Sequence, residues 1–213
     1  MSVRRRRRLV AAVGSCALLG GGVAYAVSEP PSTDSATAHI VFTHVSVNER
    51  TCPAANGSTF IEQRVVVQGV ATGDPRLSGD VELHSTLLTT AEDPPGTQQG
   101  TLRIREPGGA WKAQGRFVLA GNEVASAGSV AGEVRDPARP GGTRSTLIAP
   151  FLFSFNPDGS ITADLGGRAP ADVEAVLIRG HCTGPFDHFD VDIPAPGGAP
   201  GVAALRPAGA GWR

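Results

Sequence analysis

Apolar and polar residues alternate in short segments along this chain, and Gly, Pro, Asn and Asp separate the segments. In one segment, Trp111, Phe117 and Leu119 hold odd-numbered positions, whereas the charged Lys112 and Arg116 hold even-numbered ones. Successive side chains of a strand point to opposite faces, so a period of two is typical of a strand with one buried face. The pattern therefore predicts half-buried strands.

The same alternation predicts about eight or nine strands in all. They are expected at residues 39–48, 59–71, 80–90, 100–106, 110–120, 127–135, 144–156, 160–166 and 173–182. Residues 106–109 and 156–159 are compact turns that supply Gly where a positive φ is needed. Because such short links join antiparallel neighbours, we expect an antiparallel sheet.

A sheet of this many consecutive strands tends to close, since closure removes the two unpaired edges that would invite association. We therefore predict an all-β fold, a single antiparallel up-and-down β-barrel of about eight strands with disordered termini. An immunoglobulin-type β-sandwich is the alternative, because Trp111 lies between Cys52 and Cys182 in the sequence. A long helical bundle is excluded, because 28 Gly and 17 Pro in 213 residues are too many helix breakers.

The first 26 residues have the organisation of an export signal. Arg4–Arg8 is a positively charged run, and the fifteen residues Leu9–Val23 carry no charge. Ala24 and Ala26 place small side chains where a signal peptidase cleaves, so we predict a signal peptide at residues 1–26 and a secreted product. A retained anchor is the alternative, but fifteen helical residues span only about 22 Å of a hydrocarbon core of about 30 Å.

The rest of the chain divides into three predicted parts. Residues 27–38 are polar and indicate a linker, residues 39–184 form the barrel domain, and residues 185–213 form a mostly disordered tail. Residues 186–194 could instead be a last docking strand. A lipid anchor through Cys16 is an alternative destination, because Val13–Cys16 resembles a lipobox.

Charge narrows the classes of partner. Removing residues 1–26 takes away five Arg and no acidic residue, which changes the net charge from −1 to about −6 and leaves Lys112 as the single lysine. Such a chain lacks the basic surface that binds nucleic acid or anionic lipid. We expect no nucleic-acid partner and no stable membrane span after cleavage.

Cys52 and Cys182 are the pair of cysteines left after cleavage, and an even pair in an oxidising compartment predicts a disulfide. In the chain-entropy model, closing so long a loop stabilises the fold by about 5 kcal/mol. The bond would bring the first and last strands side by side. Two free thiols are the alternative, and a metal site is disfavoured because the zinc spacing is absent.

Several glycine-containing motifs carry a resemblance. Gly73–Gly79, Ala113–Phe117, Gly128–Gly132 and Phe151–Ser160 look like segments of exported proteins of unassigned function from high-GC bacteria. More distantly, they are similar to the eight-stranded barrels of allene oxide cyclases and dirigent proteins. The resemblance covers about residues 59–182 and implies a barrel that encloses an apolar substrate. No functional residue of those families is carried over.

Glu62 and Arg64 are the candidate ligand-binding residues. Together with Phe60 and Val66 they lie on one face of a predicted strand. They are either a polar pair inside the barrel mouth or a pair on the surface. His44, His84 and His181 are further polar candidates; we expect His84 to be solvated and His181 to pack near the disulfide.

Residues 187–192, with the sequence DHFDVD, are the best metal candidate, because alternate Asp and His present oxygen and nitrogen ligands. The run lacks a recognised calcium-loop spacing, so we expect a solvated acidic stretch, no metal and no cofactor. Catalytic motifs such as Gly-x-Ser-x-Gly and His-Glu-x-x-His are absent from the sequence. We therefore predict a non-catalytic exported barrel that binds a small apolar ligand or a cell-surface component; an isomerase or cyclase acting within the barrel is the alternative.

Overall fold

A computed structural model describes residues 33–91, 96–122, 124–135, 144–167, 178 and 180–197. Within these residues the structure has nine strands and one 3₁₀ helix. In chain order they are β1 (Ala38–Pro53), β2 (Thr59–Gly73), η1 (Pro75–Leu77), β3 (Gly79–Thr90), β4 (Gly96–Arg105), β5 (Trp111–Gly121), β6 (Ala125–Arg135), β7 (Arg144–Phe155), β8 (Ile161–Leu165) and β9 (Asp187–Asp192). The described residues contain no helix long and apolar enough to cross a membrane.

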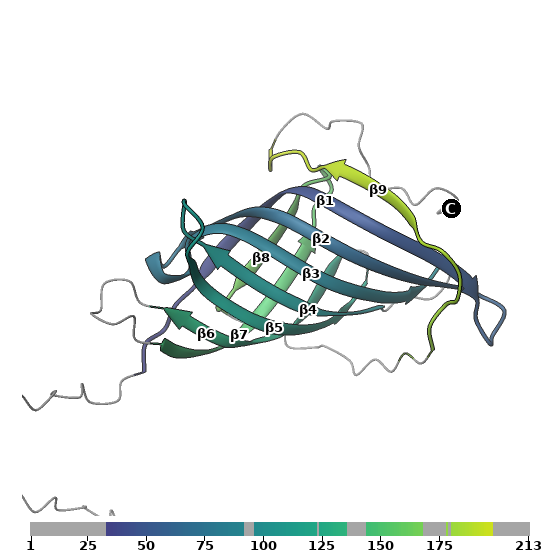
Figure 1. Cartoon of the computed structure of the whole chain (residues 1–213), viewed down its shortest axis with the longest axis horizontal. Helices are drawn as coiled ribbons and strands as arrows, with labels where there is room; N and C mark the ends of the chain where they lie inside the picture. Colours follow the sequence, from purple (N-terminus) through teal and green to yellow (C-terminus); the bar gives the residue numbers. More distant parts are fainter. Residues whose placement is uncertain are drawn as a thin grey trace, which may run out of the picture. The chain divides into compact units, whose positions relative to one another are not determined.

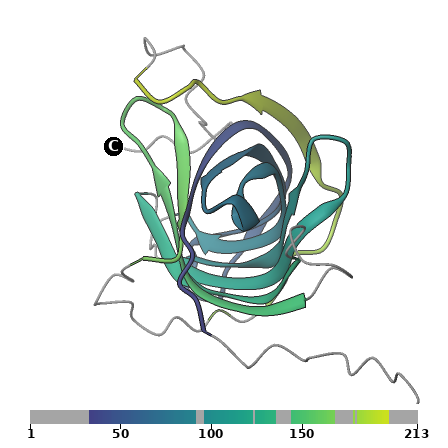
Figure 2. The ribbon, with the colours of Figure 1, turned by 90° about the vertical axis from the view of Figure 1, so that its left-hand side faces the viewer.

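Strands β1 to β8 form a closed antiparallel barrel (Figures 1 and 2). Each pairs with its neighbour in sequence, and residues 38–41 of β1 pair with residues 162–165 of β8 to close the ring. The predicted all-β barrel is confirmed, and the first eight predicted segments correspond to β1 to β8. Most of the ninth, 173–182, lies outside the described residues; of its members, Ile178 and residues 180–182 are described and are not in a strand.

Strand β9 is an additional strand outside the ring, drawn above β1 in Figure 1. β1 uses one edge for two partners in succession: β8 along residues 38–41 and β9 along residues 44–49. A bulge between Phe42 and His44 separates the two stretches. Of the two expectations for residues 186–194, the structure therefore shows the docking strand, which lies beyond the expected end of the domain at residue 184.

Alternation along the strands fills the interior, as the sequence pattern predicts. Most inward-facing residues of the barrel strands are buried, and the largest of them are fully so. Those with an exposed fraction of 1% or less include Ile40, Phe42, Leu83, Leu102, Ile104, Phe117, Val130, Phe151 and Leu165. Burying a side chain of this size contributes about 1.5–3 kcal/mol, so this set dominates the stability of the barrel.

The connection between β2 and β3 closes one end of the barrel. η1 appears inside the outline of the ring in Figure 2, and its Leu77 is 1% exposed. Asp74 caps η1, because its carboxylate accepts hydrogen bonds from the Arg76 N–H (2.9 Å) and from the Arg76 guanidinium (2.8 Å). The Lys112 ammonium donates to the carbonyl oxygens of Pro75 (3.1 Å) and Ser78 (3.2 Å), which fixes this plug to β5.

Candidate functional site: a cavity bounded by β9

The interior is hollow in the part of the barrel that lies away from η1. A cavity of about 160 Å³ that is partly open to the outside lies there between inward-facing side chains of β1, β2, β3, β4, β7, β8 and β9. Its lining consists of Val45, Val47, Gln63, Val65, Val67, Leu87, Gln98, Phe153, Phe155, Ile161 and Phe189. An eight-stranded barrel is either filled by side chains or holds one small ligand, and this one is filled over only part of its length.

Hydrocarbon makes up most of the lining. Six residues are aliphatic and three are phenylalanines. The rings of Phe153 and Phe155 lie 5.2 Å apart between centroids, and Phe153 also stacks on Phe42 at 5.1 Å. Aromatic pairs at these separations stabilise one another beyond their area burial, so this wall of the cavity is rigid.

Two amides are the polar groups of the lining. Gln63 Nε2 donates to the Glu49 carboxylate at 2.6 Å, and Gln98 Nε2 donates to Ser85 Oγ at 2.9 Å. An ionised carboxylate only accepts hydrogen bonds, so Glu49 fixes which end of the Gln63 amide faces it. Gln98 and Ser85 are both buried. The cavity therefore contains a few ordered polar groups in an apolar lining.

β9 supplies a wall of the cavity where β8 has ended. Its inward-facing Phe189, opposite Val47 of β1, lies in the lining. Just after β9, Ile193 is buried and its N–H donates to the Thr43 carbonyl oxygen at 2.9 Å. The apolar side chains at positions 189 and 193 thus hold β9 against the barrel and close the side of the cavity.

The outward face of β9 is polar and bonded to β1. His44 Nδ1 lies 3.0 Å from Asp192 Oδ1, and His188 Nε2 lies 3.2 Å from Asp190 Oδ2. The Ser46 hydroxyl, together with the nearby His188 and His44, lowers the pKa of Asp190. Among the described residues, no group of three His, Cys, Asp or Glu side chains is arranged to hold a metal. The predicted acidic run is therefore an exposed row of side chains paired along the β1–β9 ladder.

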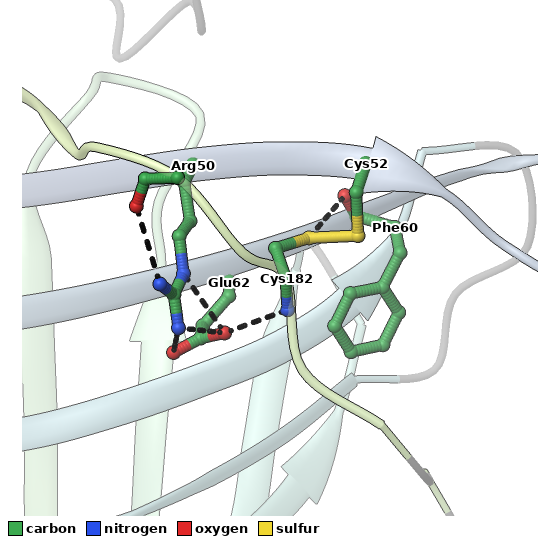
Figure 3. Close-up of a disulfide and its surroundings, with 6 residues drawn as sticks. Arg50, Cys52, Phe60, Glu62 and Cys182 are labelled. Carbon is green, nitrogen blue, oxygen red and sulfur yellow. Dashed lines mark hydrogen bonds and ion pairs between the residues drawn. A yellow bond between two sulfur atoms is a disulfide. The ribbon is translucent and has the colours of Figure 1, made fainter.

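The cysteines lie on the outer wall and tether the segment that precedes β9 (Figure 3). Cys52 near the end of β1 and Cys182 are joined, with their Cα atoms 5.6 Å apart, as predicted. The expected consequence was wrong, however: the bond does not bring the first and last barrel strands together. The β1–β8 ladder already does so, and Cys182 belongs to a segment outside the ring that has no strand structure.

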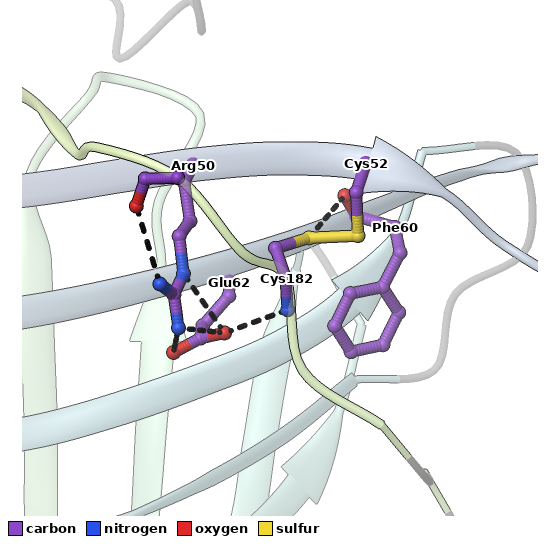
Figure 4. Close-up of polar contacts among 6 residues, drawn as sticks. Arg50, Cys52, Phe60, Glu62 and Cys182 are labelled. Carbon is purple, nitrogen blue, oxygen red and sulfur yellow. Dashed lines mark hydrogen bonds and ion pairs between the residues drawn. A yellow bond between two sulfur atoms is a disulfide. The ribbon is translucent and has the colours of Figure 1, made fainter.

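Glu62 faces outward from β2, but the tethered segment covers it (Figure 4). Its carboxylate accepts hydrogen bonds from Arg50 Nη2 (2.8 Å), Arg50 Nε (3.1 Å) and the Cys182 N–H (3.1 Å). Burial opposes ionisation, but these hydrogen bonds and the charges of Arg50 and Arg64 outweigh it and lower the pKa of Glu62. The group is a buried carboxylate that stays ionised.

Arg64 also points outward. Its guanidinium lies 4.5 Å from the centre of the Phe186 ring, and that of Arg50 lies 4.3 Å from the same ring. Both distances are in the range of cation–π contacts, so Phe186 fastens the tethered segment to β1 and β2. Glu62 and Arg64 are thus outer-wall residues whose contacts run through Arg50 and Phe186, and neither belongs to the cavity lining.

The remaining histidine candidates are exposed. His84 lies 2.7 Å from the Glu82 carboxylate on the outer face of β3, as expected for a solvated position. His181 is exposed although its neighbour Cys182 is buried, and the expectation that it packs near the disulfide stays a prediction. The cavity residues Gln63, Gln98 and Phe189 were not among the predicted site residues. The alternation offered a signal for Gln63. Gln63, Val65 and Val67 hold alternate positions of β2, so their side chains face the same side of the sheet.

Comparisons with known proteins add no relative. No protein-family model matches the chain, and neither curated proteins nor solved structures gave a match. The chain is therefore characterised by its own geometry as an eight-stranded antiparallel barrel with a disulfide-tethered outer strand.

Proposed function

We propose that this chain is an exported protein that binds a small apolar molecule inside its barrel. The cavity carries the proposal. At about 160 Å³ it is close in size to an engineered apolar protein cavity of about 150 Å³ that stays dry and binds benzene. Its lining of hydrocarbon side chains matches the chemistry of such a ligand.

The lining favours binding over catalysis. The lining consists of hydrocarbon and amide side chains, which do not titrate between pH 2 and 12, and the Glu49 carboxylate beside it accepts a hydrogen bond from Gln63 Nε2. Gln63 and Gln98 are suited to orient a ligand through hydrogen bonds. The buried carboxylate of Glu62 is on the outer wall and serves the tethered segment rather than the cavity.

Export is supported by the disulfide and by the predicted signal peptide. The bond between Cys52 and Cys182 is of the kind that persists in oxidising compartments and is rare in the cytosol. The signal at residues 1–26, the predicted secretion and the alternative lipid anchor at Cys16 lie outside the described residues and stay predictions.

Native mass spectrometry of the protein purified from its own host tests the proposal. We expect an additional mass of one small molecule on the folded protein, lost when the protein is denatured. The matched control is Val65→Phe, which fills the cavity with a larger side chain and should abolish the extra mass while the barrel remains folded. An equal extra mass on both proteins, or none on either after incubation with benzene, would overturn the proposal.

A further inference from the structure

We infer that the cavity selects a compact aromatic molecule that carries one hydrogen-bond donor. This inference rests on the proposed function and names the class of ligand for the same site. Three features of the lining carry it: one amide oxygen fixed as an acceptor, three phenylalanine rings, and a volume suited to a single ring.

The acceptor is Gln63 Oε1. Glu49 binds the Nε2 end of this amide at 2.6 Å, and because a carboxylate cannot donate, the amide cannot be reversed without losing that bond. Gln63 Oε1 accepts no hydrogen bond from the described part of the chain. No buried side-chain oxygen there lacks a partner, so Gln63 Oε1 is accessible rather than sealed. A ligand donor that reaches it would complete its hydrogen bonding.

The rings favour an aromatic body. Phe153 and Phe155 come from β7, and Phe189 comes from β9, so the aromatic surfaces are held by two separate elements. Aromatic pairing gains on the order of 0.5–1.5 kcal/mol beyond buried area, which corresponds to about twofold to twelvefold in affinity. A saturated ring of the same size would forgo this gain.

The volume suits a ligand with one ring. The cavity is close in size to an engineered cavity that holds benzene. Phe189 stays in place because β9 is held by its ladder to β1 and by buried Ile193. One aromatic ring with a short substituent therefore fills the walled part of the cavity, and a second fused ring would extend into its open side.

Three probes with equal numbers of heavy atoms test this: benzyl alcohol, ethylbenzene and cyclohexylmethanol. Each is titrated into the purified, oxidised full chain, and affinity is measured by calorimetry or by amide chemical shifts. We expect benzyl alcohol to bind tightest. Ethylbenzene, which lacks the donor, should bind about fivefold more weakly. Cyclohexylmethanol, which lacks the aromatic ring, should bind about twofold to twelvefold more weakly.

A pair of variants on the same strand isolates the acceptor. Gln63→Met keeps the side-chain length but removes the amide, so it should abolish the preference for benzyl alcohol and leave ethylbenzene binding in place. Gln68→Met is the matched control, because Gln68 is exposed on the opposite face of β2, and it should leave both affinities unchanged. If Gln63→Met fails to fold, the relative affinities of the three probes for the original protein still test whether the ligand needs a donor and an aromatic ring.

The outcomes separate this inference from the proposed function. Equal affinity for benzyl alcohol and ethylbenzene, or a preference that survives Gln63→Met, would overturn the donor assignment while the cavity remained a binding site. Tightest binding of cyclohexylmethanol would overturn the aromatic assignment. Absence of binding by all three probes would overturn the proposed function itself.

Discussion

Both halves of the barrel have alternating inward and outward side chains, but the inward side chains fill only one of them. The half next to η1 receives large inward residues such as Phe42, Leu102 and Phe117, which are fully buried. The half next to β9 receives Val45 and Val65 among others, and a cavity remains. Alternation decides which residues point inward, whereas side-chain size decides whether they fill the space.

The two halves also differ in how they are closed. η1 plugs its end from the inside with Leu77, which belongs to the hydrophobic core. β9 closes the other half from the outside, through a ladder to β1 and a disulfide anchored on the outer wall. The packed half is thus held by its own core, and the cavity half depends on a tethered segment.

Removing the tether should have the largest effect. The double variant Cys52→Ser, Cys182→Ser opens a loop of 130 residues, so we expect a loss of about 5 kcal/mol in the free energy of unfolding, measured by denaturant titration. A reducing agent should lower the stability of the original protein to the same level and leave the variant unchanged. A loss of less than 1 kcal/mol would show that the tether contributes little.

Replacing a phenylalanine by alanine should have the second-largest effect on stability, and the loss should differ between the two halves. Phe117→Ala in the packed half should cost about 3–5 kcal/mol, because a cavity opens where none existed. Phe155→Ala, which enlarges a space that is already present, should cost clearly less. Both are measured by thermal or denaturant unfolding, and equal losses would contradict the difference between the halves.

The Arg50–Glu62 pair should give the next effect. Glu62→Gln leaves the Arg50 charge under the tethered segment without its partner, at a cost of about 3 kcal/mol at neutral pH. The folded pKa of Glu62 is below its ordinary value of 4.5, so its stabilisation is present above pH 4.5 and is lost as the pH falls through the lowered pKa.

Unfolding of the original protein and of Glu62→Gln, followed from pH 7 into the acid range, measures this effect. The difference between the two proteins should be largest at neutral pH and shrink below the lowered pKa. A difference that is independent of pH would mean that the ionised carboxylate is not the stabilising form.

Substitutions that add side-chain volume should have smaller effects, and these should differ between the two halves. Val130→Phe adds volume to a site that is 0% exposed and fully packed, so we expect a loss of about 1–3 kcal/mol. Val65→Phe adds the same volume next to the cavity and should change stability by less than about 1 kcal/mol. Equal destabilisation by both substitutions would mean that the cavity cannot accept a ring.

The smallest effect concerns Asp158, in the turn that follows Phe155. The Ser160 hydroxyl, the Gly197 N–H and the Ser160 N–H hydrogen bond to its carboxylate and lower its pKa to about 2. A carboxyl-detected NMR titration should show this midpoint, and Ser160→Ala, which removes the hydroxyl donor, should raise it. A midpoint near 3.8 in the original protein would show that the hydrogen bonds to Asp158 are not formed.

The strands could be predicted because their signal is local. Alternation and turn residues placed β1 to β8, and residues 186–194 carried the alternation Phe189, Val191, Ile193 that β9 uses. Which edge β9 joins could not be predicted, because strand pairing between residues 44–49 and 187–192 depends on contacts far apart in the chain. The choice of docking strand or tail therefore stayed open.

The ion pair between Arg50 and Glu62 on the outer wall could not be predicted either, because it also depends on strand register. Glu62 and Arg64 lie two positions apart on one face, so the sequence favoured a pair between them. The register of β1 against β2 instead places Arg50 directly opposite Glu62. The cavity could not be predicted for a different reason. Alternation indicates that Gln63 and Val65 point inward, but it gives no information on the volume left between opposite walls of the barrel.

A crystal structure of the oxidised protein soaked in ethylbenzene would show whether the cavity holds an apolar molecule. We expect electron density for one molecule inside the barrel, in contact with Phe153, Phe155 and Phe189, with β9 in place on β1. A barrel interior whose side chains close the space, or whose cavity holds only ordered water under the same conditions, would contradict this expectation.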